Sequence, residues 1–509
     1  MTLNWIRDAV MLARLTRDLP GFLRRAVTCE AAAELVQQRV AARDERFLDV
    51  ARRLIFDNPR SPYRPLLRTA GCEFGDLQAL VARVGLEGAL GSLADAGVCV
   101  SFDEFKGRDT RRFAFAESDF DNPSVTPHIE IRRGGTRGPA TSVKIGLPFI
   151  ADQAVDVAVA LEAQGLSDYA HALWLLSSGV TVSLRLAKTG RWPAAWFYPL
   201  PSLTTKLKVG SRWLASIGRL PVPRYLDLRE PERLARWLPE QNRNICLTCY
   251  ASSAVRICRA AVEQKLSLER VNFWTFGEPM TEAKLAVIHQ AGARATVPYG
   301  LTEAGLVAFA CAQPSAPDDM HLFRDAFAMI QRPRAVGETG ATVPAFLLTG
   351  LLETAPKILL NVEPGDHGTL TTRRCGCPLD QLGLTEHISY VRSYEKLSSE
   401  GMTFVKTDLL RVLEQVLPQR FGGAPADYQL LEQEDVTGIL RLHLLVNPVV
   451  GPVDEAAVRH AFLEALAEPG GYAPLGADFW RRAETLQVKC QPPVATRAGK
   501  ILPFHLIKS

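Results

Sequence analysis

The sequence predicts an α/β protein: a large N-terminal domain with a helical first portion, followed by a small α+β C-terminal domain. A chain of 509 residues is longer than one hydrophobic core usually supports, so more than one domain is expected. Short apolar runs alternate with helical patterns over residues 128–208 and 244–371, which is typical of an α/β domain. The C-terminal region has its own strand-then-helix pattern, formed by Leu440, Leu442, Leu444, Val458, Phe462 and Leu466.

The division between the domains is expected near Arg392, after a cysteine-bearing loop and before Gly401. The large domain then covers residues 1–392 and the small C-terminal domain residues 393–509. Residues 1–120 read mainly as helices. This helical portion carries no obvious chemistry of its own.

Composition excludes several classes of partner. The 59 basic and 55 acidic residues give a net charge of +4, with no block of like charge suited to a nucleic-acid arm. No run of about 18 apolar residues occurs, so no membrane span is expected, and charged residues interrupt the N-terminal stretch as in an amphipathic helix. Ten cysteines without an export signal favour a reducing compartment, and we expect a cytoplasmic protein.

A glycine-rich segment runs from Arg133 to Pro139, between strand-like residues 129–131 and 141–145. Such a turn can wrap backbone N–H groups around phosphate oxygens, because glycine permits close approach and positive φ angles. The segment lacks the spacing and the following helix of a P-loop. By itself, such a segment is more often an ordinary hairpin turn.

Two further segments contain groups suited to nucleotide chemistry. Phe276-Gly277-Glu278-Pro279 closes a largely apolar run, and residues 299–305 read Tyr-Gly-Leu-Thr-Glu-Ala-Gly. A glycine-flanked aromatic ring, a hydroxyl and a carboxylate together offer a stacking surface, a phosphate contact and a magnesium ligand. The three segments in this order resemble the motifs of the adenylate-forming enzymes, and in particular their phenylacetate:CoA ligase-like branch. The resemblance spans roughly residues 125–509 and extends to Asp366, Arg392 and Lys500.

The resemblance implies a role for each matching residue. Glu303, Thr302 and Lys500 would be catalytic, with Lys500 bridging the acyl carboxylate and the phosphate. The nucleotide would be held by Gly135, Thr136, Gly138, Gly277, Glu278, Pro279, Tyr299, Gly300, Asp366 and Arg392. The cofactors implied are ATP, Mg²⁺ and coenzyme A.

The chain also departs from the family pattern. The phosphate loop has Arg133, Arg137 and Pro139 where the family usually has small hydroxyl residues and a lysine. The segment before Asp366 needs a two-residue insertion to match the family, which leaves Glu363 as a rival ribose ligand.

A second group of residues predicts a structural Zn²⁺ site. Cys311 and His321 follow the Tyr-Gly-Leu-Thr-Glu segment, and Cys375 and Cys377 lie in one tight loop. Three thiolates and an imidazole suit tetrahedral zinc, and four protein ligands leave no position for a substrate. Many phenylacetate:CoA ligase-like proteins carry a similar set, which strengthens the expectation. The alternative is a buried Cys311 with an exposed Cys375 and no metal.

The resemblance implies two reaction steps: ATP-dependent activation of a carboxylic acid to an acyl-adenylate, then transfer to a thiol, most simply coenzyme A. Aromatic residues between the phosphate loop and the adenine segment favour an aromatic acid. Transfer to a carrier-protein thiol or an amine remains open, as does a non-catalytic nucleotide- or acyl-binding homologue. A homodimer is also left open.

Overall fold

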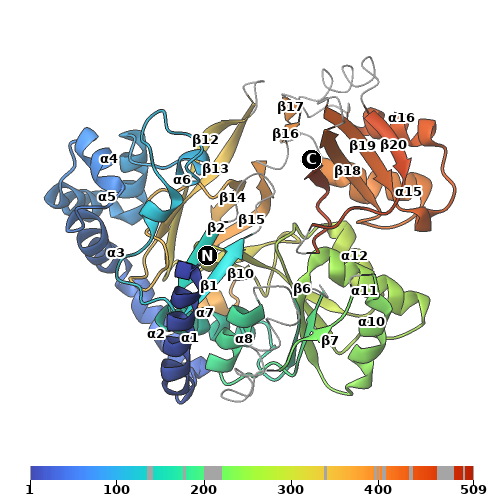
Figure 1. Cartoon of the computed structure of the whole chain (residues 1–509), viewed down its shortest axis with the longest axis horizontal. Helices are drawn as coiled ribbons and strands as arrows, with labels where there is room; N and C mark the ends of the chain where they lie inside the picture. The colour runs from blue at the N-terminus through green and yellow to red at the C-terminus, as the bar shows by residue number, and fades with distance from the viewer. Residues whose placement is uncertain are drawn as a thin grey trace.

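The computed structural model describes residues 2–133, 141–175, 179–199, 221–227, 229–336, 341–394, 398–399, 402–403, 409–434, 440–466, 486–496 and 499–507. The chain forms a large N-terminal domain, built from helices and two principal sheets, and a smaller C-terminal domain with a sheet of its own (Figure 1). The predicted α/β fold class with a small α+β C-terminal domain is confirmed. Within the described residues, no helix combines the length and the apolar character that crossing a bilayer requires.

Helices dominate the first 120 residues, as predicted. They are α1 (Thr2–Leu23), α2 (Cys29–Ala41), α3 (Arg43–Ala51), the π-helical turn η1 (Arg52–Phe56), α4 (Tyr63–Thr69), α5 (Phe74–Asp95), α6 (Phe102–Phe105) and the 3-10 turn η2 (Glu117–Phe120). A capping box begins α6, where Ser101 and Glu104 each accept a hydrogen bond from the other's backbone N–H. This short, capped helix ends directly before Lys106.

The first principal sheet is parallel throughout, with the order β5-β4-β3-β6-β7-β8. Its strands are β3 (Ala170–Trp174), β4 (Ala195–Tyr198), β5 (Arg224–Tyr225), β6 (Ile245–Tyr250), β7 (Val271–Phe276) and β8 (Arg294–Thr296). Every residue of β6 is buried, so Cys246 and Cys249 belong to the core. Tyr250 pairs with Phe276, and the loops after β6 and β7 therefore open at one edge of the sheet.

Helices flank this parallel sheet. They are α7 (Leu147–Ala163), α8 (Gly179–Lys188), α10 (Pro231–Glu240), α11 (Ala251–Glu263) and α12 (Glu282–Gln290). The helices α10, α11 and α12 gather on one side of the sheet, beneath the C-terminal domain (Figure 1). Their apolar faces supply the large buried core that holds the strand ends in place.

The second principal sheet has the order β12-β13-β14-β15-β11-β10-β9, with antiparallel neighbours. Its strands are β9 (Pro298–Leu301), β10 (Gly305–Ala310), β11 (Met320–Leu322), β12 (Phe327–Val336), β13 (Ala341–Gly350), β14 (Asp366–Thr372) and β15 (Glu386–Ser393), with helix α13 (Pro378–Gln381) between β14 and β15. A separate antiparallel hairpin joins β1 (Ile129–Arg133) to β2 (Thr141–Ile145), so both strands predicted around the glycine-rich segment are present.

The C-terminal domain has a four-stranded sheet of order β20-β19-β18-β21. It comprises β18 (Tyr428–Glu434), β19 (Leu440–Val446), β20 (Leu486–Cys490), β21 (Phe504–Ile507), α14 (Leu409–Arg411), η5 (Val412–Val416), α15 (Leu417–Phe421), η6 (Pro448–Val450) and α16 (Glu455–Leu466), and the short strands β16 (Ser398–Ser399) and β17 (Met402–Thr403) precede it. Leu442 and Leu444 of β19 share a buried core with Val458 and Phe462 of α16, which confirms both predicted periodicities.

Ion pairs dock the C-terminal domain onto α11 and α12. Lys284 Nζ lies 2.8 Å from Glu414 Oε1, with only 3% and 5% of the two side chains exposed, and the Thr281 hydroxyl also donates to Glu414. Arg259 and Asp427 form a second pair at 2.5 Å. These contacts bring the last loop of the chain to the edge of the parallel sheet.

Candidate active site

The turn between β9 and β10 carries Thr302 and Glu303. Gly305 closes it with a φ of 75°, in the left-handed region that favours glycine. Gly300 is equally constrained, because a Cβ there would lie 2.9 Å from the Gly305 carbonyl oxygen. The two glycines therefore hold a tight turn that presents a hydroxyl and a carboxylate from adjacent positions.

Tyr299, at the start of the same segment, reaches the next predicted residue. Its hydroxyl donates to Asp366 Oδ2 at 2.8 Å, and the ring is buried. The rival residue Glu363 faces elsewhere: its carboxylate accepts from the Tyr394 hydroxyl at 3.1 Å and from the Phe102 backbone at 3.4 Å. Burial raises the pKa of Glu363. Asp366, not Glu363, thus shares its surroundings with Tyr299.

Arg392 lies on β15, where it pairs with His367 in the register that also pairs Asp366 with Ser393. Its backbone is therefore close to the Asp366 segment. Its guanidinium, however, donates to Asp318 Oδ2 at 3.0 Å. In this arrangement the Arg392 side chain ties β15 to Asp318, which stands shortly before β11.

Glu278 and Pro279 bind neighbouring helices. The Glu278 carboxylate accepts from the Ser252 backbone N–H at 2.7 Å and from its hydroxyl at 2.9 Å, at the first turn of α11. The positive end of the α11 helix dipole also stabilises a buried carboxylate at this position. The Pro279 carbonyl accepts from Lys284 at 2.9 Å. Both residues position the segment around Gly277.

Lys500 approaches that segment from the C-terminal domain. Its Nζ lies 5.1 Å from the centre of the Tyr250 ring, and a Cβ on Gly277 would come within 2.6 Å of Nζ. Gly277 has a φ of 75°, so both its backbone and the lysine require glycine there. The Ile501 N–H donates to the Ser252 hydroxyl at 3.4 Å, which ties the lysine loop to α11. The structure thus brings Lys500, Gly277 and Tyr250 together.

Three predicted phosphate contacts, Gly135, Thr136 and Gly138, lie outside the described residues. The strands on either side, β1 and β2, are paired in register from Ile129 with Ile145 to Arg133 with Thr141.

Lys106 is a site residue that the sequence analysis missed. Its Nζ lies 2.5 Å from Glu303 Oε1 and 3.2 Å from Glu117 Oε1. No motif marks it, because the pair joins positions 197 residues apart.

Of the aromatic residues that favoured an aromatic acid, most pack in the core and one lies at the candidate site. Trp174 and Trp196 donate to backbone carbonyls of Leu226 and Leu175, and Phe197 packs against Trp237. Trp274 packs against Phe309. Tyr250 belongs to the candidate site, because its ring contacts the Lys500 ammonium, and its centre lies 5.2 Å from that of the Phe276 ring.

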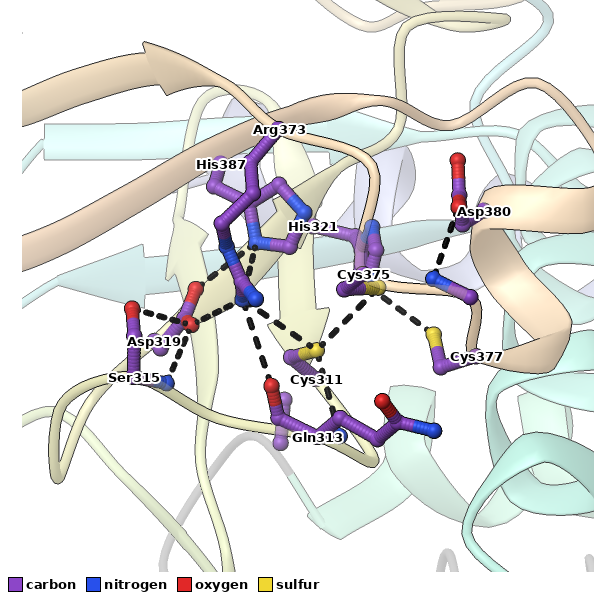
Figure 2. A network of polar contacts seen from close by, with 12 residues as sticks. Cys311, Gln313, Ser315, Asp319, His321, Arg373, Cys375, Cys377, Asp380 and His387 are labelled. Carbon is purple, nitrogen blue, oxygen red and sulfur yellow. Dashed lines mark hydrogen bonds and ion pairs between the residues drawn. The ribbon is translucent and has the colours of Figure 1, made fainter.

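Cys311, His321, Cys375 and Cys377 form a cluster whose ligand atoms all lie within 4.8 Å of one another (Figure 2). Cys311 Sγ is 3.7 Å from Cys375 Sγ, and His321 Nε2 is 3.6 Å from Cys375 Sγ and 3.1 Å from Cys377 Sγ. Tetrahedral zinc, with bonds of about 2.3 Å to sulfur and 2.0 Å to nitrogen, separates two sulfurs by about 3.8 Å and sulfur from nitrogen by about 3.5 Å. The donor set and its spacing fit that ion.

The surroundings of the cluster also favour a metal. His321 Nδ1 lies 2.6 Å from the Leu384 carbonyl and must donate to it, so Nε2 presents its lone pair to the thiols. Arg373 lies 3.7 Å from Cys311 Sγ and supplies positive charge, while Asp319 holds that guanidinium at 2.5 Å (Figure 2). The hydrogen bond from the Cys311 thiol lowers the pKa of Cys377.

Comparison with known proteins identifies the fold. No profile of a known protein family and no curated protein matches the chain. It is similar to a crystal structure of 2-hydroxyisobutyryl-CoA ligase in the postadenylation state with 2-HIB-AMP, with a TM-score of 0.57 and 14% identity, covering 93% of this chain and 90% of that chain. A structure of the same ligase with R3-HIB-AMP gives a TM-score of 0.54 at the same identity and coverage. The chain therefore has the fold of the adenylate-forming enzymes. At this identity, the similarity is one of fold.

Proposed function

We propose that the chain activates a carboxylic acid with ATP to an acyl-adenylate and then transfers the acyl group to a thiol, which we assign as coenzyme A. We further propose that the acid is aromatic and that the chain belongs to the phenylacetate:CoA ligase-like branch. The observation that carries it is the approach of Lys500 to Gly277 and Tyr250. The contact between Tyr299 and Asp366 also supports it. The 2-hydroxyisobutyryl-CoA ligase of the same fold was solved with an acyl-adenylate, which also supports it.

In the first step, an oxygen of the substrate carboxylate bonds to the α-phosphorus of ATP, and the bond to pyrophosphate breaks. Two anions must approach each other, and negative charge develops on the leaving group. The compact ammonium of Lys500 offsets the first problem, because it can contact the carboxylate and the phosphate together. A Mg²⁺ ion, held by Glu303 and Thr302, would supply positive charge at the phosphates.

The remaining predicted residues take binding roles in the proposal. Gly135, Thr136 and Gly138 offer backbone N–H groups to the phosphates. Asp366 accepts from the ribose hydroxyls, and Tyr299, which contacts it, lies against the adenine. The pocket is shaped by the remaining residues, which fix the turns and helix contacts around it: Gly300, Glu278, Pro279 and Arg392.

In the second step, the thiol sulfur bonds to the acyl carbon, AMP leaves, and the thiol proton passes to solvent. We propose that residues 393–509 rotate between the steps, as in proteins with this fold that use one site twice. Lys500 then withdraws, and the pairs Lys284–Glu414 and Arg259–Asp427 separate. We place the pivot near Glu395 or Lys396, with Gly401 brought toward the site in the second state. These three residues lie outside the described part of the chain.

We also propose that a structural zinc ion is bound by Cys311, His321, Cys375 and Cys377. The spacing of their ligand atoms is the support. Four protein ligands close the coordination sphere, so the ion would join the end of β10 to the loop between β14 and β15 without touching substrate.

A panel of aromatic and aliphatic acids, tested for acid-dependent exchange of pyrophosphate into ATP, examines the first step directly. We expect exchange with at least one acid, and thioester formation when coenzyme A is added. An adenylate that forms but ignores coenzyme A would redirect the proposal to a protein thiol or an amine. Absence of exchange across the panel would favour a non-catalytic binding protein.

Replacing Gly277 with alanine should lower the exchange rate by roughly ten- to a hundredfold, because the new methyl group displaces the Lys500 ammonium. Gly165→Ala is the matched control: its φ of 64° imposes the same backbone strain, but nothing lies within 4 Å of the added Cβ. Both variants should lose about 1 kcal/mol of stability. Equal exchange rates in the two variants would show that the contact between Gly277 and Lys500 does not matter for the reaction.

A further inference from the structure

The ammonium of Lys106 lies between two carboxylates from different parts of the chain. Glu303 Oε1 is 2.5 Å away on the β9–β10 turn, and Glu117 Oε1 is 3.2 Å away in η2. Only 8% of the Lys106 side chain is exposed, with 7% for Glu303 and 12% for Glu117. Two acidic groups and one basic group give this triad a net charge of −1 in a poorly solvated position.

The triad borders an open space. Lys106 and Glu303 line a small cavity of about 20 Å³, whose other walls include Phe102, Phe105 and Glu363. The Phe105 ring lies 5.0 Å from the ammonium and gives it an additional favourable contact. A ligand that enters this cavity can therefore meet the lysine and the carboxylate together.

The proposed function gives Glu303 a second cation to bind. A carboxylate that holds an ammonium at 2.5 Å cannot also take a divalent ion without bringing like charges within a few ångströms of each other. At a separation of about 5 Å in a poorly solvated site, that repulsion costs several kcal/mol. Glu303 without any cation is no alternative, because a buried, unpaired carboxylate is also costly.

We propose that Lys106 is a resident cation that neutralises Glu303 in the nucleotide-free protein and moves to Glu117 when a divalent metal ion binds Glu303. The inference rests on the proposed function and assigns Lys106 as a positioning residue of that site. Glu117 is already 3.2 Å from Nζ, so a small rotation of the side chain keeps the ammonium paired. The ion pair between Lys106 and Glu303 thus keeps the β9–β10 turn in place before the nucleotide binds.

The test is the affinity of the nucleotide-free full chain for Mn²⁺. Electron paramagnetic resonance measures it through the signal of the free ion. Lys106→Met removes the competing cation and should tighten Mn²⁺ binding by about tenfold or more. Glu117→Gln removes the second counter-ion, so Lys106 stays on Glu303 and binding should weaken several-fold. Adding Glu303→Gln to Lys106→Met should abolish the gain. Lys144→Met, which removes a half-exposed lysine paired with Asp121, should leave affinity unchanged.

Lys106→Met should tighten Mn²⁺ binding and Glu117→Gln should weaken it. These opposite effects distinguish competition for Glu303 from a purely structural role of Lys106. Unchanged or weaker Mn²⁺ binding in Lys106→Met overturns the proposal. Should that variant not fold, Glu117→Gln decides: weaker binding supports the proposal, and equal or tighter binding overturns it. A second readout is thermal unfolding, in which Mg²⁺ should stabilise Lys106→Met more than the wild type. These measurements need no substrate acid, so a chain that fails to exchange pyrophosphate can still pass them.

Discussion

Replacing Lys500 with alanine should lower acid-dependent pyrophosphate–ATP exchange by about two to three orders of magnitude, which corresponds to a loss of about 3–4 kcal/mol of transition-state stabilisation. The ammonium lies at the edge of the parallel sheet, within cation–π distance of Tyr250 and against Gly277. Removing it leaves the approach of carboxylate to phosphate without that neutralising charge. Exchange at saturating ATP and acid is the measurement, because it reports the chemical step.

Folding should be unaffected by this substitution, since Lys500 is partly exposed and belongs to a short loop. The loop is held by its own backbone, in which Thr496 donates to the Lys500 carbonyl at 2.8 Å. Lys489→Ala is a matched control, because it removes a lysine of the same domain that contacts His443 instead. A Lys500→Ala variant that exchanges pyrophosphate at the rate of this control would exclude Lys500 from the reaction.

The elements of this chain were predictable where a local pattern determines them. The alternation of Leu442 and Leu444 and the spacing of Val458 and Phe462 each follow from one buried face, and the structure has both. The strands around the glycine-rich segment follow from their flanking residues in the same way. The roles of Gly135, Thr136 and Gly138 remain predictions, since those residues lie outside the described part of the chain.

Pairings between distant side chains were not predictable, because they depend on tertiary packing. Glu278 caps α11 since β6 and β7 are adjacent and parallel, and its own segment gives no sign of this. Asp366 and Glu363 are three positions apart and chemically alike, yet only Asp366 reaches Tyr299. Lys106 meets Glu303 through the placement of a capped helix that carries no motif.

Replacing Cys375 with serine should release the proposed zinc ion and lower the free energy of unfolding by roughly 2–5 kcal/mol, the order expected when a cross-link is lost. The cluster joins three segments: Cys311 directly follows β10, His321 lies in β11, and Cys375 and Cys377 lie between β14 and β15. Metal content by mass spectrometry and the midpoint of thermal unfolding are the measurements. Cys490→Ser, at an exposed cysteine outside the cluster, is the control.

The same substitution should also weaken nucleotide binding, although no ligand of the cluster touches the site. β10 starts at Gly305, directly after the turn that carries Glu303, and β14 starts at Asp366. A clamp on the other ends of these strands restrains both, so its loss should let the carboxylates drift from the positions proposed to bind one nucleotide. ATP affinity should fall together with zinc content when a chelator is titrated. Zinc-free protein that retains its unfolding midpoint and its ATP affinity would show that the thiols and His321 hold each other by hydrogen bonds alone.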